Sequence, residues 1–300
     1  MRDTPKNATC LYLILTPAFS SVFWALIIWS RHLGSGQGEL AFGLMWCPAL
    51  AALASCRFLG RSFRSLAWRW PKGRYVALAY FLPLAYAGVA YGVVWGLRLG
   101  GWNSQFTVQV AHSFGLRGMP AWGSLALYLA LTPTVSMIFN LTWALGEEVG
   151  WRGFLVPELS KQMSFTKLSL LSGVIWAAWH SPILLFADYN AGTNRWYALA
   201  CFTVMVVSQC FVFAWLRLKS GSLWPAALLH GSHNMFVQEI FDNLMRDTGR
   251  TRWYTTEFGV ALALASAALA VYFWTRRAEV EQPVTDALPA ADAPPLSAYL

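Results

Sequence analysis

The chain alternates between long uncharged blocks and short segments that carry most of its charges. About 20 residues suffice for a helix to cross the apolar part of a bilayer, and each block reaches or approaches that length. The blocks are 7–30, 40–56, 75–97, a stretch from 118 toward 156, 168–187, 196–216, 220–238 and 258–275. Two of them, 40–56 and 258–275, are near the short limit, so seven spans remain an alternative. The pattern predicts an all-α polytopic membrane protein, a bundle of about eight transmembrane helices.

We interpret residues 1–277 as a single transmembrane domain with a motif-bearing core at about 120–245. Residues 278–300 are rich in alanine and proline and have no apolar periodicity, which predicts a disordered tail. Composition agrees with a membrane protein: 57% of the residues are hydrophobic and 12% are charged, whereas soluble domains carry about 25% charged residues.

The net charge of +8 does not indicate a nucleic-acid partner, because the basic residues follow the loops. Six of them crowd the segment 57–74 between the second and third blocks. Others follow the sixth and eighth blocks, and the remaining loops hold fewer or have theirs diluted by acids. Since basic residues favour the cytoplasmic side, we expect both termini in the cytoplasm of a protein integral to a bacterial plasma membrane.

The polar residues inside the blocks are the candidates for function, because a charge in the middle of a membrane costs roughly 2.5–3.5 kcal/mol. Glu147 and Glu148 follow an uncharged run, and Arg152 lies one turn after Glu148 on the same helical face. Pro133 and Pro157 are expected to begin and end this helix, which would place both acids in the cytoplasmic half of the membrane. The pair can be a structural counter-ion for Arg152, but one cation does not need two acids.

Histidines lie inside two later blocks: His180 in one, and His230 and His233, with Asn234, in the other. A lone intramembrane histidine often serves only as a hydrogen bond between helices. His230 and Asn234 are one turn apart, whereas His233 points about 100° away from Asn234 and fits a contact with a neighbouring helix. Four tryptophans near the motifs are expected at a lipid-facing entrance or at the membrane interface, and they are Trp143, Trp151, Trp176 and Trp179.

Taken in order, EExxxR, an aromatic-xxx-His and HxxxN resemble the three motifs of the CPBP family, the CAAX proteases and bacteriocin-processing enzymes. The motifs match as Glu147, Glu148 and Arg152, then Trp176 and His180, where the family usually has phenylalanine before the histidine, and then His230 and Asn234. The resemblance covers roughly residues 120–245. It implies an intramembrane endopeptidase, a hydrolase that acts on a membrane-anchored or lipidated peptide or protein, of the CAAX prenyl-protein type.

The residue types suit this reaction in two ways. In a metal-free version Glu147, helped by His180, activates water, while His230 and Asn234 donate hydrogen bonds to the oxyanion and Arg152 holds Glu148 ionised. In a metalloprotease version one glutamate with His180 and His230 binds Zn²⁺, whose water attacks. Two other classes stay open: a proton-coupled transporter that uses the same residues as a relay, and a non-catalytic immunity or interaction protein.

Overall fold

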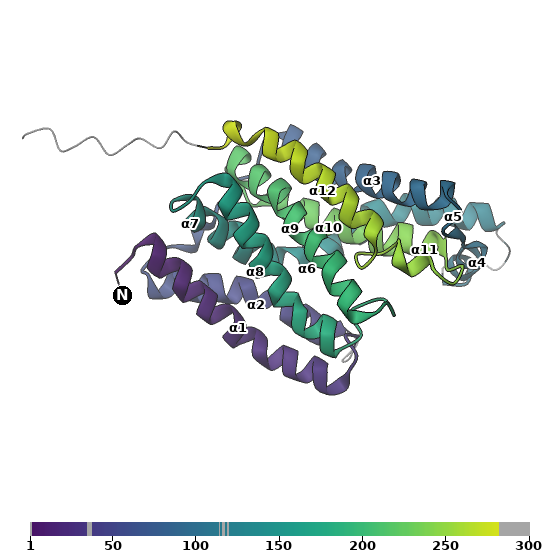
Figure 1. Ribbon diagram of the computed structural model, residues 1–300, viewed down its shortest axis with the longest axis horizontal. Coiled ribbons are helices and arrows are strands. Elements are labelled where there is room, and N and C mark those ends of the chain that lie inside the picture. Colours follow the sequence, from purple (N-terminus) through teal and green to yellow (C-terminus); the bar gives the residue numbers. More distant parts are fainter. Residues whose placement is uncertain (1, 35–37, 114, 116–117, 119, 282–300) are drawn as a thin grey trace, which may run out of the picture.

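The structure is a computed structural model that describes residues 2–34, 38–113, 115, 118 and 120–281. It is almost entirely helical, and the predicted fold class is confirmed (Figure 1). Six helices are long and apolar enough to cross a membrane: α1 (Pro5–Ser30), α2 (Glu39–Phe58), α3 (Gly73–Gly96), a continuous helix over Trp122–Ser160, α8 (Phe165–Phe186) and α9 (Arg195–Ser220). The two remaining blocks are also helical. They form the run α10 (Trp224–His233), η5 (Asn234–Phe241) and α11 (Asp242–Leu244), and the shorter α12 (Val260–Thr275). The predicted disordered tail begins at residue 278, but residues 278–281 are ordered: Arg277–Glu279 form a 3₁₀ helix, and Glu281 accepts a hydrogen bond from the backbone N–H of Phe165. The rest of the predicted tail, 282–300, lies outside the described residues.

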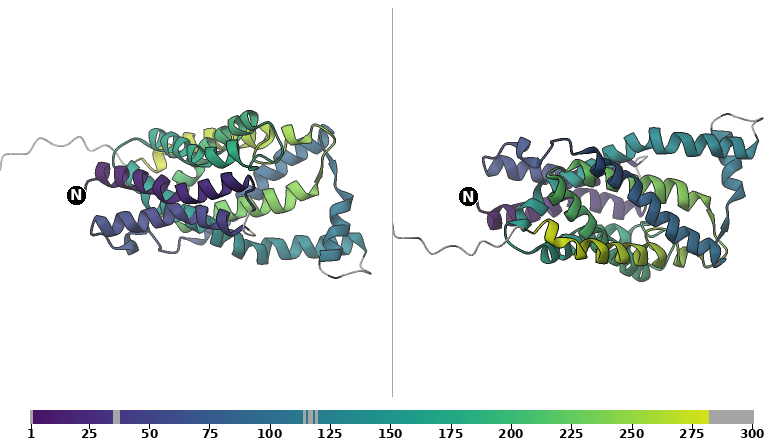
Figure 2. Two further views of the ribbon diagram at one scale, coloured as in Figure 1. Left: turned by 90° about the horizontal axis from the view of Figure 1, so that it is seen from below. Right: turned by 90° about the horizontal axis from the view of Figure 1, so that it is seen from above.

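The helices lie alongside one another, so the molecule has two ends (Figures 1 and 2). We call the end where α1 begins and α12 finishes the terminal end; it also holds the connections 59–72, 161–164 and 221–223. The opposite, distal end holds the connections 31–34, 97–103, 187–194 and 245–259, together with α4 (Ser104–Ser113). There β1 (Gly101–Trp102) pairs antiparallel with β2 (Met245–Arg246), which ties the end of α3 to the end of α11.

The prediction that Pro133 and Pro157 bound the fourth helix is wrong. The helix runs through α5 (Ala121–Leu131), η3 (Thr132–Ser136), α6 (Met137–Glu148), η4 (Val149–Leu155) and α7 (Val156–Ser160). Both η segments are π-helical: Pro133 lies inside η3, and Pro157 is the second residue of α7, two positions after the end of η4. A proline interrupts an α-helix because it lacks an N–H and collides with the carbonyl four residues earlier, and the wider π turn relaxes both constraints. The depth inferred for the acids from these boundaries therefore has no support.

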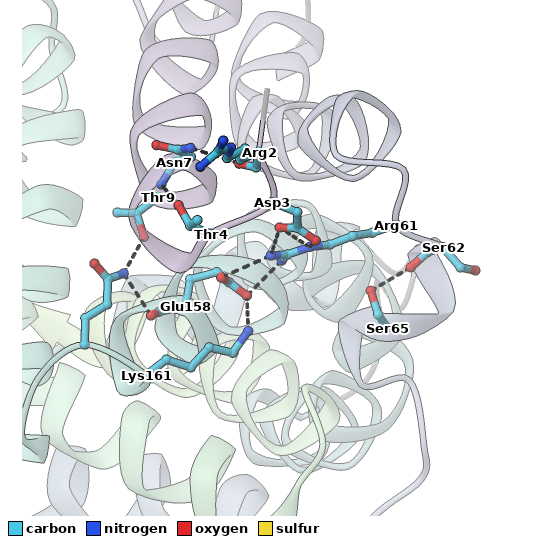
Figure 3. A network of polar contacts seen from close by, with 11 residues as sticks. Arg2, Asp3, Thr4, Asn7, Thr9, Arg61, Ser62, Ser65, Glu158 and Lys161 are labelled. Carbon is cyan, nitrogen blue, oxygen red and sulfur yellow. Dashed lines mark hydrogen bonds and ion pairs between the residues drawn. The ribbon is translucent and has the colours of Figure 1, made fainter. Parts of the chain in front are cut away.

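At the terminal end, an ionic network joins three segments (Figure 3). Arg61, which follows α2, contacts Asp3 through Nε (2.9 Å) and Glu158 of α7 through Nη1 (2.9 Å). Lys161 also reaches the Glu158 carboxylate, at 2.6 Å. This network fixes the start of α1 and the end of α2 against α7, and it therefore closes this end of the bundle with charged groups.

Two glycines that flank the acids let the fourth helix approach α2 closely. A Cβ atom on Gly146 would lie 2.7 Å from the carbonyl oxygen of Met45, and one on Gly150 would lie 2.6 Å from the carbonyl carbon of Pro48. The stretch GEEVG is thus also a GxxxG pattern, in which small residues allow two membrane helices to touch through their backbones. The acids sit where these two backbones meet.

We expect Gly150→Ala to destabilise the protein by about 1–3 kcal/mol or more, because backbone atoms of α2 would have to move. Gly92→Ala is the matched control, since it also adds one methyl group to a helix but a Cβ there meets nothing within 4 Å. The measurement is thermal unfolding of both variants in detergent. Equal melting temperatures for the two variants would show that the close approach of the fourth helix to α2 is not tight.

Candidate functional site

The two adjacent acids end α6, and both are buried, with 1% and 0% of their surface exposed for Glu147 and Glu148. Glu148 makes the ion pair that the sequence predicts: Nη1 of Arg152 lies 2.9 Å from one carboxylate oxygen and 3.1 Å from the other. Arg152 lies in η4 and is 1% exposed. A buried charge is stable only when it is paired and its remaining hydrogen-bonding atoms are occupied, so the surroundings of Arg152 matter.

The Arg152 guanidinium is enclosed by three side chains from α8 and α9. Its central carbon lies 4.3 Å from the ring centre of Trp176 and 4.0 Å from that of Phe213, so it sits close to two aromatic rings. Nη2 lies 3.1 Å from the sulfur of Cys210. Cation–π contacts gain strength when water is excluded, as it is here. The arginine therefore links the fourth helix to α8 and α9 without meeting solvent.

Glu147 has different partners. Its Oε2 accepts hydrogen bonds from the indole N–H groups of Trp176, at 2.6 Å, and Trp151, at 3.2 Å. The prediction that the tryptophans face lipid or the interface is wrong for Trp151, Trp176 and Trp179, which are at most 5% exposed. Tryptophan is enriched at membrane interfaces, where its N–H meets water or lipid headgroups. A buried tryptophan can instead donate its N–H to a buried carboxylate. The spacing of four residues between Glu147 and Trp151 is the sequence signal for this contact.

The two motif histidines are each fixed through Nδ1. In His230 of α10, Nδ1 lies 3.0 Å from Oε1 of Glu148, and in His180 of α8 it lies 3.0 Å from the carbonyl oxygen of Trp176. A carbonyl oxygen only accepts hydrogen bonds, so we assign the proton of His180 to Nδ1, which leaves Nε2 as the nitrogen that can accept a proton. His230 faces a carboxylate oxygen instead, so its Nδ1–H is the donor of the hydrogen bond to Glu148.

One cavity of about 200 Å³ brings the three motifs together. Glu147, His180, His230 and Asn234 all line it, and they come from α6, α8, α10 and the start of η5. Glu148 and Arg152 do not line this cavity; they lie behind it, Glu148 against His230 and Arg152 against Trp176 and Phe213, which do line it. The structure therefore separates the six predicted site residues into four that face the cavity and two that support them.

A second buried cluster lines the same cavity and was not predicted. His233 contacts Glu257 through Nε2 (2.9 Å) and Tyr86 of α3 through Nδ1, and the amide of Gln209 lies 3.4 Å from that Nδ1. The other Glu257 oxygen accepts a hydrogen bond from Tyr189 at 3.1 Å. His233 thus makes the neighbouring-helix contacts expected of it. Glu257 escaped the sequence reading because it lies in a loop among other charged residues, 24 positions from its partner.

The residues present do not form a recognisable metal site. Within the part of the chain that the structure describes, no three His, Cys, Asp or Glu side chains converge as metal ligands would. One Glu147 oxygen already accepts two indole N–H groups, and both motif histidines use Nδ1 elsewhere.

Comparisons with known proteins agree with the motifs. Residues 128–236, which contain all three motifs, match the family model described as type II CAAX prenyl endopeptidase Rce1-like. The chain is also 27% identical over 193 residues to CAAX prenyl protease 2 of Methanococcus maripaludis. This similarity covers 62% of the chain and 62% of the relative, which is less than two thirds of either. The resemblance that the motifs predict is thereby confirmed.

We expect Arg152→Ala to destabilise the protein by about 3–5 kcal/mol, because it leaves Glu148 buried without its cation. Lys219→Ala is the control: it removes a partly exposed ion pair with Glu279, worth about 0–1 kcal/mol. Both variants are compared by thermal unfolding in detergent. If Arg152→Ala unfolds at the same temperature as Lys219→Ala, the buried ion pair does not hold the site together.

Proposed function

We propose that this chain, which resembles the type II CAAX prenyl endopeptidases, is an intramembrane endopeptidase of that type that hydrolyses a peptide bond with water activated by Glu147. One observation carries the proposal: residues of three motifs, far apart in sequence, line a single buried cavity. The match to the family over residues 128–236 supports the same reaction class. We propose a membrane-anchored or lipidated peptide or protein as the substrate.

The reaction begins with water in the cavity beside Glu147. The carboxylate takes a proton from the water as its oxygen forms a bond to the peptide carbonyl carbon, and Nε2 of His180 is a second acceptor for that proton. The two indole N–H groups hold Glu147 in place through one oxygen and leave the other for the water. The proton then passes to the amine as the C–N bond breaks.

The oxygen of the substrate's peptide carbonyl becomes negatively charged when water adds, and hydrogen-bond donors stabilise this charge. His230 and Asn234 lie one turn apart and both line the cavity, so their side chains suit this oxyanion role. Glu148 supports His230 by accepting the hydrogen bond of its Nδ1–H, which fixes the ring, and the Nε2–H is the donor to the oxyanion when both ring nitrogens carry a proton. Arg152 pairs with Glu148 and packs on Trp176, so it acts on the reaction through His230 and through the indole that donates to Glu147. His233 is engaged with Glu257 and is not assigned to the oxyanion.

Glu147→Gln is expected to abolish cleavage of a lipidated peptide while the protein remains folded, because glutamine has nearly the same size but cannot accept the proton. Glu39→Gln, an exposed glutamate in the first turn of α2, is the control and should leave turnover unchanged. Turnover by the Glu147 variant near the wild-type rate would remove Glu147 as the base, and no cleavage by the wild type would favour the transporter or immunity alternatives. Loss of wild-type activity on adding a chelator would favour the metal-dependent version.

Trp176→Phe tests the orientation of Glu147, because it keeps an aromatic ring against Arg152 and deletes only the 2.6 Å donor. A hydrogen bond to a charged group contributes about 1.5–3 kcal/mol, so turnover should fall by about 10- to 100-fold. Trp224→Phe is the matched control: it deletes an indole donor to the carbonyl of Trp68 at the terminal end. Equal turnover by the two variants would show that Trp176 acts only as packing.

A further inference from the structure

We propose that a hollow at the terminal end of the bundle binds the phosphate group of an anionic phospholipid, and that Arg217 is the residue that contacts this phosphate. The hollow has a volume of about 1040 Å³ and shares no lining residue with the cavity of the three motifs. It lies between α7, the first turn of α8, the last turn of α9 and the segment that follows α12. We call it the terminal hollow.

Arg217 is a buried cation that lines the terminal hollow, and it is 9% exposed. Its Nε donates to the carbonyl oxygen of Arg152 at 2.8 Å. Arg152, which is also buried, has Glu148 as its counter-ion, whereas no described acid forms an ion pair with Arg217. A buried charge is costly unless it is paired, and the two Nη groups of a guanidinium match two oxygens of a phosphate. Arg217 therefore indicates an anionic ligand from outside the chain.

The first turn of α8 adds positive potential to the same hollow. Ser164 is the N-cap residue of this 22-residue helix, and its side chain makes no capping hydrogen bond. The backbone N–H of Phe165 donates to Glu281 at 3.2 Å, but those of Thr166 and Lys167 meet no acceptor among the described residues. Ser164 and Phe165 both line the hollow. Free N–H groups at a helix N-terminus attract anions, phosphate among them.

The other charged groups of the lining leave room for an anion at Arg217. The charged lining residues are two cations, Lys161 and Arg217, and one acid, Glu281. Lys161 is engaged with Glu158 of α7 at 2.6 Å. Glu281 contacts the first turn of α8 and forms no ion pair with Arg217 in the described part of the chain. The lining is thus net positive, and its buried cation is the one that keeps its charge available.

The terminal hollow lies where a lipid headgroup is expected. Trp274 of α12 donates its indole N–H to Thr166 in the first turn of α8 at 3.1 Å, and it is 41% exposed. Exposed tryptophans of membrane proteins gather at the level of the headgroups. Leu171 lies one turn after the lining residue Leu168 along α8 and is 39% exposed, so an apolar surface continues from the hollow. A basic pocket above apolar helix faces favours a lipid phosphate over a free one.

The position of Arg217 predicts what the lipid does. Because Arg217 holds the carbonyl oxygen of Arg152, it connects the terminal hollow to η4, the segment behind the motif cavity. A phosphate that pairs with Arg217 fixes this contact. A ligand that binds only the folded protein raises its stability, so the lipid should raise the melting temperature.

Binding is measured by native mass spectrometry on the full chain in a neutral detergent, with phosphatidylglycerol added. Arg217→Gln removes the guanidinium, and Ser164→Asp keeps a good N-cap residue but adds a negative charge to the lining. The matched controls are Arg64→Gln and Ser62→Asp, which make the same changes at exposed residues of the terminal end that do not line the hollow. Phosphatidylcholine and inorganic phosphate are the comparison ligands.

We expect phosphatidylglycerol to bind the wild type more tightly than phosphatidylcholine, whose choline cation offsets the phosphate charge. Its affinity should fall by about 10- to 100-fold in Arg217→Gln and in Ser164→Asp, as for a lost hydrogen bond to a charged group, and should stay unchanged in the controls. The lipid should also raise the melting temperature of the wild type and of the controls more than that of the two hollow variants. If Arg217→Gln does not fold, Ser164→Asp decides, because it leaves Arg217 in place.

Equal affinity for phosphatidylglycerol in the wild type, the hollow variants and the controls would overturn the site. Binding of inorganic phosphate that depends on Arg217, without binding of phosphatidylglycerol, would overturn the lipid and assign the hollow to a free phosphate. These measurements need no turnover, so their outcome is independent of the proposed hydrolysis.

Discussion

The buried ion pair of Glu148 and Arg152 is the constraint on which the rest of the site depends. The chain surrounds this pair with parts of four helices: Glu148 from α6, Trp176 from α8, Phe213 and Cys210 from α9, and His230 from α10. The Nε of Arg152 is left buried without a hydrogen-bond partner among the described residues. Because each helix supplies one wall or one partner, the helices cannot move independently without exposing or unpairing a charge. The position of His230 in the cavity is a consequence of this arrangement.

Two chemically identical neighbours acquire different properties from what surrounds them. Successive residues of an α-helix point about 100° apart, so Glu147 and Glu148 face different neighbours. Glu148 meets the Arg152 guanidinium and the His230 ring, and both hold it in place. Glu147 meets only the neutral N–H groups of Trp151 and Trp176 and an open cavity. Neutral donors orient a carboxylate without neutralising it, which is what a base that must take up a proton requires.

The fold class and the motif residues could be predicted from sequence because both depend on local signals. The uncharged blocks are long enough to predict the membrane-spanning helices. Charged residues inside them cost insertion free energy, which marks them as candidates for function. The helix boundaries at Pro133 and Pro157 could not be predicted in this way, because a π turn relieves the clash that normally ends a helix and no composition rule marks it. The partners of Glu147 and His233 depend on contacts between distant helices. The sequence does not say whether a tryptophan near Glu147 contacts lipid or the carboxylate. It also does not say which side chain Glu257 contacts from its loop. The packing of the helices decides both.

Helix α10 shows how these features combine at the cavity. His230 contacts Glu148, which lies on the side of the terminal end. His233 contacts Glu257, which belongs to a connection at the distal end. The two histidines are less than one turn apart, yet their glutamate partners lie toward opposite ends of the molecule. The pair behind His230 is reinforced by Arg152 and by aromatic rings. At His233, Tyr86 and Gln209 hold the histidine from two helices, whereas Glu257 and its partner Tyr189 lie in connections. Loops open at a lower free energy than packed helices, so the Glu257 side of the cavity is held less rigidly than the Glu148 side. The unequal support of the two histidines follows from where each glutamate lies: Glu148 ends a packed helix, and Glu257 lies in a connection.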